Sequence, residues 1–367
     1  MPSETAVEAK PQAVKLEPGK TINLPSAVLG LAVASDGKLL YAACLDRFVY
    51  QVDVESKQSK PLFQHRNYAS GVKLLANGTQ LVSAGYDGAL QWFDLAAGKV
   101  IRQVDAHRFW SWKLAVSPDQ KLVASVTGQY LAGSIDYVPA DSPEPTVKVF
   151  DALTGEVRHA WTLRPPVLSV AFSPDSQHVA AGNLLGEVGV WNLGTGEQVA
   201  AWKTEVFTSW GYIKSHHYVG GIYGMAFSAN GEELLLAGMG DMKDPMAGNG
   251  AQTWQRFAWR EQPARKVDQI HAGEHGNGLM ETLTVHPSGE MFVMAGRLAQ
   301  GNWNAALFQA GDGKLIHSID NKQRNIEAVF SADGRQLFLA GAVGQRGRDK
   351  EGQCPDFGRI QVMTVAS

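Results

Sequence analysis

Cysteine is scarce in this 367-residue chain, which contains only Cys44 and Cys354. Two thiols make no disulfide framework, and no CxxC or CxxCH motif supports a zinc ribbon, an iron–sulfur cluster or a c-type haem. Basic charge is also limited, because 33 Lys and Arg residues stand against 36 Asp and Glu residues, a net charge of −3. With no basic segment to follow a phosphate backbone, nucleic acid is not expected as a partner.

Long apolar runs are absent as well, so no membrane span and no membrane partner are expected. The first twenty residues are polar and lack the apolar core of a secretory signal. We therefore expect a cytoplasmic protein in which residues 1–19 form a disordered tail. No Pro- or Ser-rich linker interrupts residues 20–367, which are expected to form one domain.

A repeated hairpin pattern is the main signal of the sequence. Each copy consists of an apolar run, a tight turn and a second apolar run, and Asp-Gly or Asn-Gly turns tolerate the positive φ that hairpins require. A further strand–turn–strand follows at 89–103, 147–161 and 188–202, so each repeat predicts the four strands of one propeller blade. Seven such turns occur, at Asp36, Asn77, Asp119, Asp175, Asn230, Ser288 and Asp333.

The second repeat resembles the WD-repeat family most closely. His65, Ser83 and Asp87 match the family's network of His, Ser/Thr and Asp, with Phe93 replacing the family's Trp. The third repeat keeps a His and a Ser, and the fourth keeps the Trp but lacks the His. The Trp-Asp position of the family is taken by Phe93-Asp94, Phe150-Asp151 and Trp191-Asn192. The resemblance covers roughly residues 20–365 and implies an all-β, seven-bladed propeller, but it says little about function.

The last repeat ends at residues 358–365 with only three of its four strands. We expect residues 20–25, KTINLP, to supply the missing outer strand. A strand borrowed from the start of the chain completes the last blade, closes the ring and removes two exposed sheet edges.

The long connections are expected on one face of the propeller. They are the loops at 127–145, 203–219, 238–251, 271–278, 296–303 and 341–357. Because variable loops on a rigid scaffold usually carry binding, we expect a non-catalytic scaffold for a protein or peptide whose identity is unknown. Aromatic and His side chains offer large contact areas at low entropic cost. The candidate binding residues are Trp110, Trp112, Tyr130, Tyr137, Phe207, Trp210, Tyr212, His216, His217, Tyr218, His271, His275 and Trp303.

Three alternatives stay open. The aromatic residues could serve only to pin the loops, or a small-ligand- or metal-binding enzyme could use the same face near the central channel, with the loop histidines as ligands. No HExxH, GxSxG or phosphate-binding motif supports such an enzyme, so no catalytic residue, metal ligand or cofactor is predicted. Cys44 and Cys354 could be neighbours, although two independent thiols are favoured.

Overall fold

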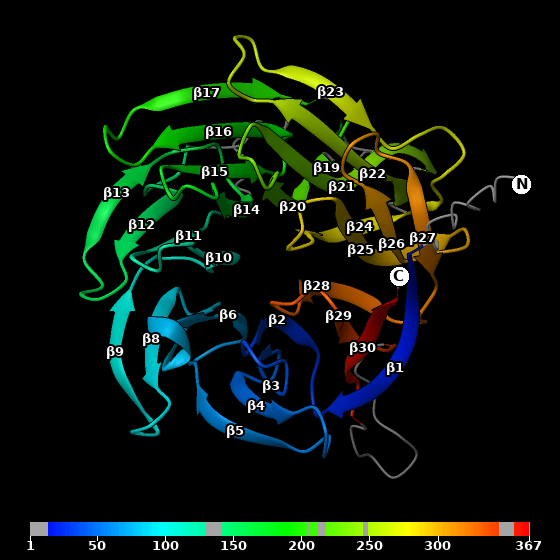
Figure 1. The fold of residues 1–367 in the computed structure, drawn as a ribbon. Helices are drawn as coiled ribbons and strands as arrows, with labels where there is room; N and C mark the ends of the chain where they lie inside the picture. The colour runs from blue at the N-terminus through cyan, green and yellow to red at the C-terminus, as the bar shows by residue number, and fades with distance from the viewer. Residues whose placement is uncertain are drawn as a thin grey trace, which may run out of the picture.

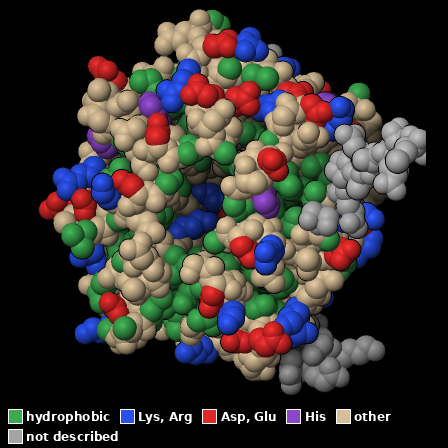
Figure 2. All heavy atoms as spheres, viewed as in Figure 1, with side chains coloured by type: hydrophobic (Ala, Val, Ile, Leu, Met, Phe, Trp, Pro, Cys, Tyr) green, Lys and Arg blue, Asp and Glu red, His purple; other side chains and the backbone are tan. Residues whose placement is uncertain are grey.

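The computed structural model describes residues 14–129, 141–204, 206–210, 218–244, 249–344 and 356–366. The described chain is all-β, apart from one short 3-10 turn, η1 (Ala76–Gly78). Its four-stranded antiparallel sheets are those of a β-propeller and are arranged in a ring (Figure 1), around a central hollow that Figure 2 shows. In the described ranges, no helix has the length and apolarity needed to cross a membrane.

Four sheets follow one another as simple meanders, each with its strands in chain order. The first comprises β2 (Val28–Val33), β3 (Leu39–Cys44), β4 (Phe48–Asp53) and β5 (Ser59–Gln64). The second comprises β6 (Ala69–Leu75), β7 (Gln80–Gly85), β8 (Ala89–Asp94) and β9 (Lys99–Asp105). The third comprises β10 (Lys113–Val116), β11 (Leu122–Val126), β12 (Val147–Asp151) and β13 (Val157–Trp161). The fourth comprises β14 (Val167–Phe172), β15 (His178–Asn183), β16 (Glu187–Asn192) and β17 (Gln198–Lys203).

The next two meanders are joined into one larger sheet by a single antiparallel pair, Ala251 with Asn277. One contains β20 (Ile222–Phe227), β21 (Glu233–Asp244), β22 (Asn249–Ala258) and β23 (Arg265–Gln269). The other contains β24 (Asn277–Val285), β25 (Met291–Gln300), β26 (Ala305–Gln309) and β27 (Leu315–Ile319). A short ribbon of β18 (Thr208–Trp210) and β19 (Tyr218–Gly220) lies between the fourth meander and these two.

The final sheet combines the two ends of the described chain. It contains β28 (Arg324–Phe330), β29 (Gln336–Ala342) and β30 (Gly358–Ala366), and β30 pairs with β1 (Lys15–Leu24). Ile22 lies opposite Ile360 in this register. The predicted strand at 20–25 is therefore too short, because β1 already begins at Lys15. Leu16 is buried in the core together with Met363, which explains why the strand extends toward the start of the chain.

Turn chemistry explains the repeated hairpins. In the β10–β11 turn the Ser117 hydroxyl donates a hydrogen bond to Asp119, 2.6 Å away. The same Asp119 carboxylate accepts a hydrogen bond from the backbone N–H of Lys121. Ser331 and Asp333 repeat this arrangement in the β28–β29 turn at 2.6 Å. Short polar side chains thus fix the turn locally, and the flanking strands take their register from it.

The innermost strand of each meander faces the central hollow (Figure 1). Neighbouring innermost strands contact one another in sequence, and β28 contacts β2. These strands are β2, β6, β10, β14, β20, β24 and β28. Apolar side chains fill the space between adjacent sheets, with Trp92, Trp254 and Trp259 among the largest that are fully buried.

Parts of two expected loops, 238–251 and 296–303, are strands. Residues 238–244 continue β21 and residues 249–251 begin β22, while residues 296–300 continue β25. The glycines that suggested a loop permit close strand contact, since a Cβ at Gly240 would lie 2.1 Å from the Thr253 hydroxyl. The expected loop at 203–219 likewise includes the β18–β19 ribbon.

Candidate binding site at the central channel

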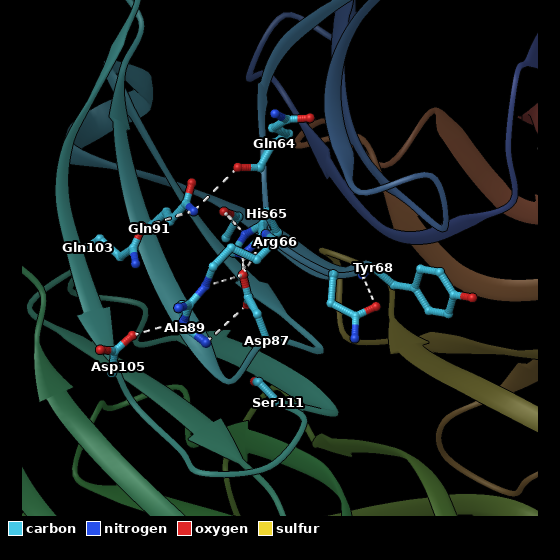
Figure 3. A network of polar contacts seen from close by, with 12 residues as sticks. Gln64, His65, Arg66, Tyr68, Asp87, Ala89, Gln91, Gln103, Asp105 and Ser111 are labelled. Atoms are coloured by element: carbon cyan, nitrogen blue, oxygen red, sulfur yellow. Dashed lines mark hydrogen bonds and ion pairs between the residues drawn. The ribbon is translucent and has the colours of Figure 1, made fainter.

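The predicted His–Ser–Asp network of the second sheet is present (Figure 3). His65 Nε2 lies 2.8 Å from Ser83 Oγ, and His65 Nδ1 lies 3.1 Å from the Asp87 carboxylate. Asp87 also accepts a hydrogen bond from the Arg66 backbone N–H at 2.8 Å. Burial would raise the pKa of Asp87, but hydrogen bonds and the His65 charge outweigh it, so the pKa is lowered. This network fixes the segment that leads to Tyr68, whose ring projects away from it in Figure 3.

A second buried histidine anchors the next connection. His107 Nε2 lies 2.9 Å from Ser125 Oγ, as the resemblance of the third repeat predicts. Ser111 Oγ lies 2.7 Å from the same hydroxyl. Burial lowers the pKa of His107 to about 3, with the positive charge of Lys148 adding to the effect. His107 is therefore neutral at pH 7, and it holds the residues that immediately precede β10.

Five aromatic side chains gather where these two connections meet, and we call them the aromatic rim. The rings of Tyr86 and Trp110 stack with centroids 4.5 Å apart, and Phe109 stacks on Trp110 at 4.8 Å. Trp112 lies edge-on to Tyr86 at 5.4 Å, and Tyr68 lies 5.8 Å from Tyr86. Tyr68 is 41% exposed and the other four rings are partly exposed. Trp110 and Trp112 were predicted, and the rim brings them together with rings contributed by neighbouring segments.

A cavity of about 480 Å³, here the upper cavity, adjoins the rim. Its walls include Tyr86 and Trp112 on one side and Tyr223 of β20 on another. Leu45 and Phe357, from connections between the second and third strands of their sheets, also line it. The upper cavity therefore opens on the face where the long connections were expected.

A second cavity of about 600 Å³, the lower cavity, is lined by all seven innermost strands. Pro118 and Pro174 of the short hairpin turns place its mouth on the opposite face. Lys113, Tyr223 and Glu281 line both cavities, so they mark the boundary between them. Figure 2 shows Lys and Arg side chains inside the central hollow.

Five charged side chains form a layer at this boundary, which we call the charged layer. The Glu327 carboxylate lies 2.8 Å from Lys113 Nζ and 3.2 Å from Lys73 Nζ, so three different sheets meet at one carboxylate. Burial would raise the pKa of Glu327, but the two ammonium groups lower it to about 2. Arg324 donates to Glu281 through two nitrogens, at 2.6 Å and 2.9 Å. Such bidentate pairs fix the orientation of the guanidinium.

Tyr223 and Tyr86 stand close to this layer. Burial raises the pKa of each phenol to about 12, and the Glu281 charge contributes to the rise while Arg324 opposes it. Both hydroxyl groups are therefore protonated at neutral pH and can donate hydrogen bonds.

Two predicted binding residues are buried, and the prediction is wrong for them. Phe207 is fully buried among residues of the fourth and fifth meanders. Trp303 is 4% exposed and belongs to the apolar cluster between the fifth and sixth meanders. Trp303 donates its indole N–H to the backbone oxygen of Glu274 at 2.9 Å. Both side chains pin their connections to the sheets, which was one of the alternatives for the loop aromatics.

The two histidines of the 271–278 connection have separate surroundings. His271 lies 3.8 Å from Asp268 and 3.9 Å from Glu274, whereas His275 contacts the backbone oxygen of Gly276. Among the residues that the structure describes, no group of three or more His, Cys, Asp or Glu side chains is arranged to hold a metal ion. Cys44 is a buried free thiol.

The remaining candidates lie in the β18–β19 ribbon or outside the described residues. Trp210 of β18 and Tyr218 of β19 lie opposite each other in the register of the ribbon. Outside the described residues lie Tyr130, Tyr137, Tyr212, His216, His217 and Cys354.

Residues 158–192 match the family model "WD domain, G-beta repeat". This segment is a WD40 repeat. It ends at Trp191-Asn192, where the sequence places the family's Trp-Asp pair, and Trp191 stacks on Trp161 with centroids 5.2 Å apart. The predicted resemblance to WD-repeat proteins is thereby confirmed. The matched segment runs from β13, the last strand of the third sheet, to β16, the third strand of the fourth sheet.

The chain is also similar to telomerase protein component 1 of Mus musculus, at 24% identity over 181 residues. The protein of the same name from Rattus norvegicus is 25% identical over 181 residues. Either match covers 49% of this chain but only 6% of the relative's own length. The likeness thus concerns a small part of a much longer protein.

Proposed function

We propose that this chain is a non-catalytic scaffold that binds a protein or peptide on the face carrying the aromatic rim. The observation that carries this proposal is the stack of partly exposed rings beside the upper cavity. Tryptophan and tyrosine dominate the energetic centres of protein interfaces, since each buries much apolar area and keeps a polar edge. The WD40 repeat agrees with a role in protein interaction.

The same proposal includes a closed ring of seven blades in one domain, which begins with β1 at Lys15 rather than at the expected residue 20, in a cytoplasmic protein. The circular series of contacts among the seven innermost strands supports the count. The pairing of β1 with β30 supports closure by the early strand. A closed ring gives the rim a rigid base, because each sheet is packed between two neighbours.

The charged layer favours binding over acid–base catalysis. A general acid or base works best when its pKa lies near the operating pH. Glu327 has a pKa of about 2 and is ion-paired with two lysines, so at pH 7 its carboxylate stays ionised and bound to both ammonium groups. The neutral His107 is buried behind the rim and hydrogen-bonded to a serine.

The candidates that the structure leaves undescribed, Tyr130, Tyr137, Tyr212, His216 and His217, remain part of the proposed face. They belong to the connections at 127–145 and 203–219. Those connections would extend the contact area beyond the rim, in keeping with the placement of binding residues on loops.

The test is binding of the purified chain to an array of immobilised random dodecapeptides. We expect a subset of peptides to bind, and Trp110→Ala to weaken their binding at least tenfold, as for a central aromatic residue of an interface. Trp161→Ala is the matched control, because Trp161 lies on the outer strand β13 and stacks on Trp191 rather than on a ring of the rim. An array without bound peptides, or equal binding by Trp110→Ala and the wild type, would overturn the proposal.

A further inference from the structure

The charged layer does not present its two signs of charge equally to the channel. The carboxylate side chains of Glu281 and Glu327 are only 7% and 13% exposed. The side chains of Arg324 and Lys113 are 49% and 24% exposed. The cations therefore cover the carboxylates, and the surface that a ligand meets consists mainly of N–H donors.

Several of these donors have capacity left. An ammonium group has three N–H bonds, and the contact recorded for Lys113 within the described chain is the one to Glu327. A guanidinium has five N–H bonds, and Arg324 uses Nε and one terminal nitrogen for Glu281. Three cations against two carboxylates also leave the layer with a net charge of +1.

We propose that the upper cavity receives the carboxylate of an acidic residue from the bound partner segment, with Lys113 and Arg324 as its hydrogen-bond donors. This inference rests on the proposed function and names the chemistry of the partner. The neighbouring residue of the segment packs on Tyr86 and Trp112, which form the aromatic part of the wall of the same cavity.

The shape and charge of the cavity fit this occupant. A volume of about 480 Å³ takes one or two side chains rather than a folded domain. A carboxylate leaving water loses its hydration, and charged donors fixed by ion pairs replace it without further ordering. A Lys or Arg side chain would instead meet the exposed cations, so the cavity selects against basic segments.

The chain contains its own matched control. Lys73 and Lys113 both bind Glu327, but only Lys113 lines the upper cavity, while Lys73 faces the lower one. Lys113→Met and Lys73→Met therefore remove the same charge from the layer and leave Glu327 with one lysine. They differ in whether a donor is lost from the upper cavity.

The experiment uses the full chain and the same array of random dodecapeptides. We expect the bound peptides to be enriched in Asp and Glu, and replacement of the acidic residue by its amide to weaken binding about tenfold. Lys113→Met should lower the affinity for the acidic peptides by a similar factor and abolish the discrimination between acid and amide. Lys73→Met should retain both the affinity and the discrimination.

A second variant covers the case in which Lys113→Met does not fold. Glu281→Gln combined with Arg324→Met removes the other ion pair without leaving a buried unpaired charge, and it should also abolish the discrimination. Bound peptides without acidic enrichment, or equal losses in Lys113→Met and Lys73→Met, would overturn the inference while the rim remained a peptide site. An array that binds nothing would overturn the proposed function and this inference together.

Discussion

The early strand β1 should contribute strongly to stability, although it lies more than three hundred residues from its partner in sequence. The side chains of Ile22 and Leu24 are completely buried between the last and first sheets. We therefore expect Ile22→Ala and Leu24→Ala each to lower the free energy of unfolding.

The magnitude follows from the burial. Truncating a fully buried Leu or Ile to Ala costs about 2–5 kcal/mol, the sum of lost transfer energy and the cavity left behind. Both residues belong to the same apolar cluster, so the double variant will not show a simple sum. A loss of about 4 kcal/mol or more would remove a large part of the roughly 5–15 kcal/mol that stabilises a typical domain.

Urea unfolding followed by the fluorescence of the ten tryptophans would measure this loss. Asn23→Ala is the control, because Asn23 lies between the two on the same strand but is exposed, and it should change the unfolding free energy by less than about 0.5 kcal/mol. If the double variant unfolded within 0.5 kcal/mol of the wild type, β1 would not be part of the folded core, and the proposed closure would be wrong.

Three further outcomes are expected. The pKa of Glu327 is about 2 in the folded protein, against an ordinary value of 4.5. Its ion pairs therefore stabilise the protein above pH 4.5, and this contribution of about 3 kcal/mol is lost as the pH falls toward 2. Glu327→Gln should weaken the dependence of the unfolding free energy on pH in this range, and an unchanged dependence would contradict the assignment. His65→Ala should lower the unfolding free energy by about 1–3 kcal/mol, because it leaves Ser83 and Asp87 without their partner; a thermal melt like that of the wild type would argue against the network. Burial raises the pKa of the Cys44 thiol, so a disulfide reagent should modify Cys44 only upon unfolding, and rapid modification of Cys44 itself, located by peptide mapping of the folded protein, would count against its burial.

The sequence predicted the hairpins and the His65 network well because both depend on local chemistry. An Asp or Asn at a turn acts within a few residues, as Asp119 does with Ser117 and Lys121. The spacing of His65, Ser83 and Asp87 lies within one repeat, so a single repeat suffices to recognise it.

The length of the strands was harder to predict. The segment GMGDMKD at 238–244 has the glycine content of a loop, yet it continues β21. Gly238 and Gly240 permit contact with Gly221 and Thr253 at distances that a Cβ would not allow. Only the three-dimensional neighbours distinguish such a glycine from one that makes a turn.

The charged layer was missed because its members are far apart in the chain. Lys73 lies inside β6, Lys113 begins β10, and Glu327 lies inside β28, each beside apolar residues of an innermost strand. A charged residue at such a position is a signal, because burial of a lone charge is costly and requires a partner. A buried charge in the sequence indicates that an oppositely charged partner exists. It does not identify the partner, because the partner depends on which strands lie next to one another around the channel.

The pairing of β1 with β30 also sets an order of events during synthesis. A ribosome adds about 5–20 residues per second, so the roughly 330 residues between these strands take on the order of 20–70 seconds to appear. During that interval Ile22 and Leu24 lack their packing against the last sheet, and the edge of β1 that pairs with β30 is open. Such an edge can pair with another nascent chain, so association between incomplete chains competes with folding until β30 emerges.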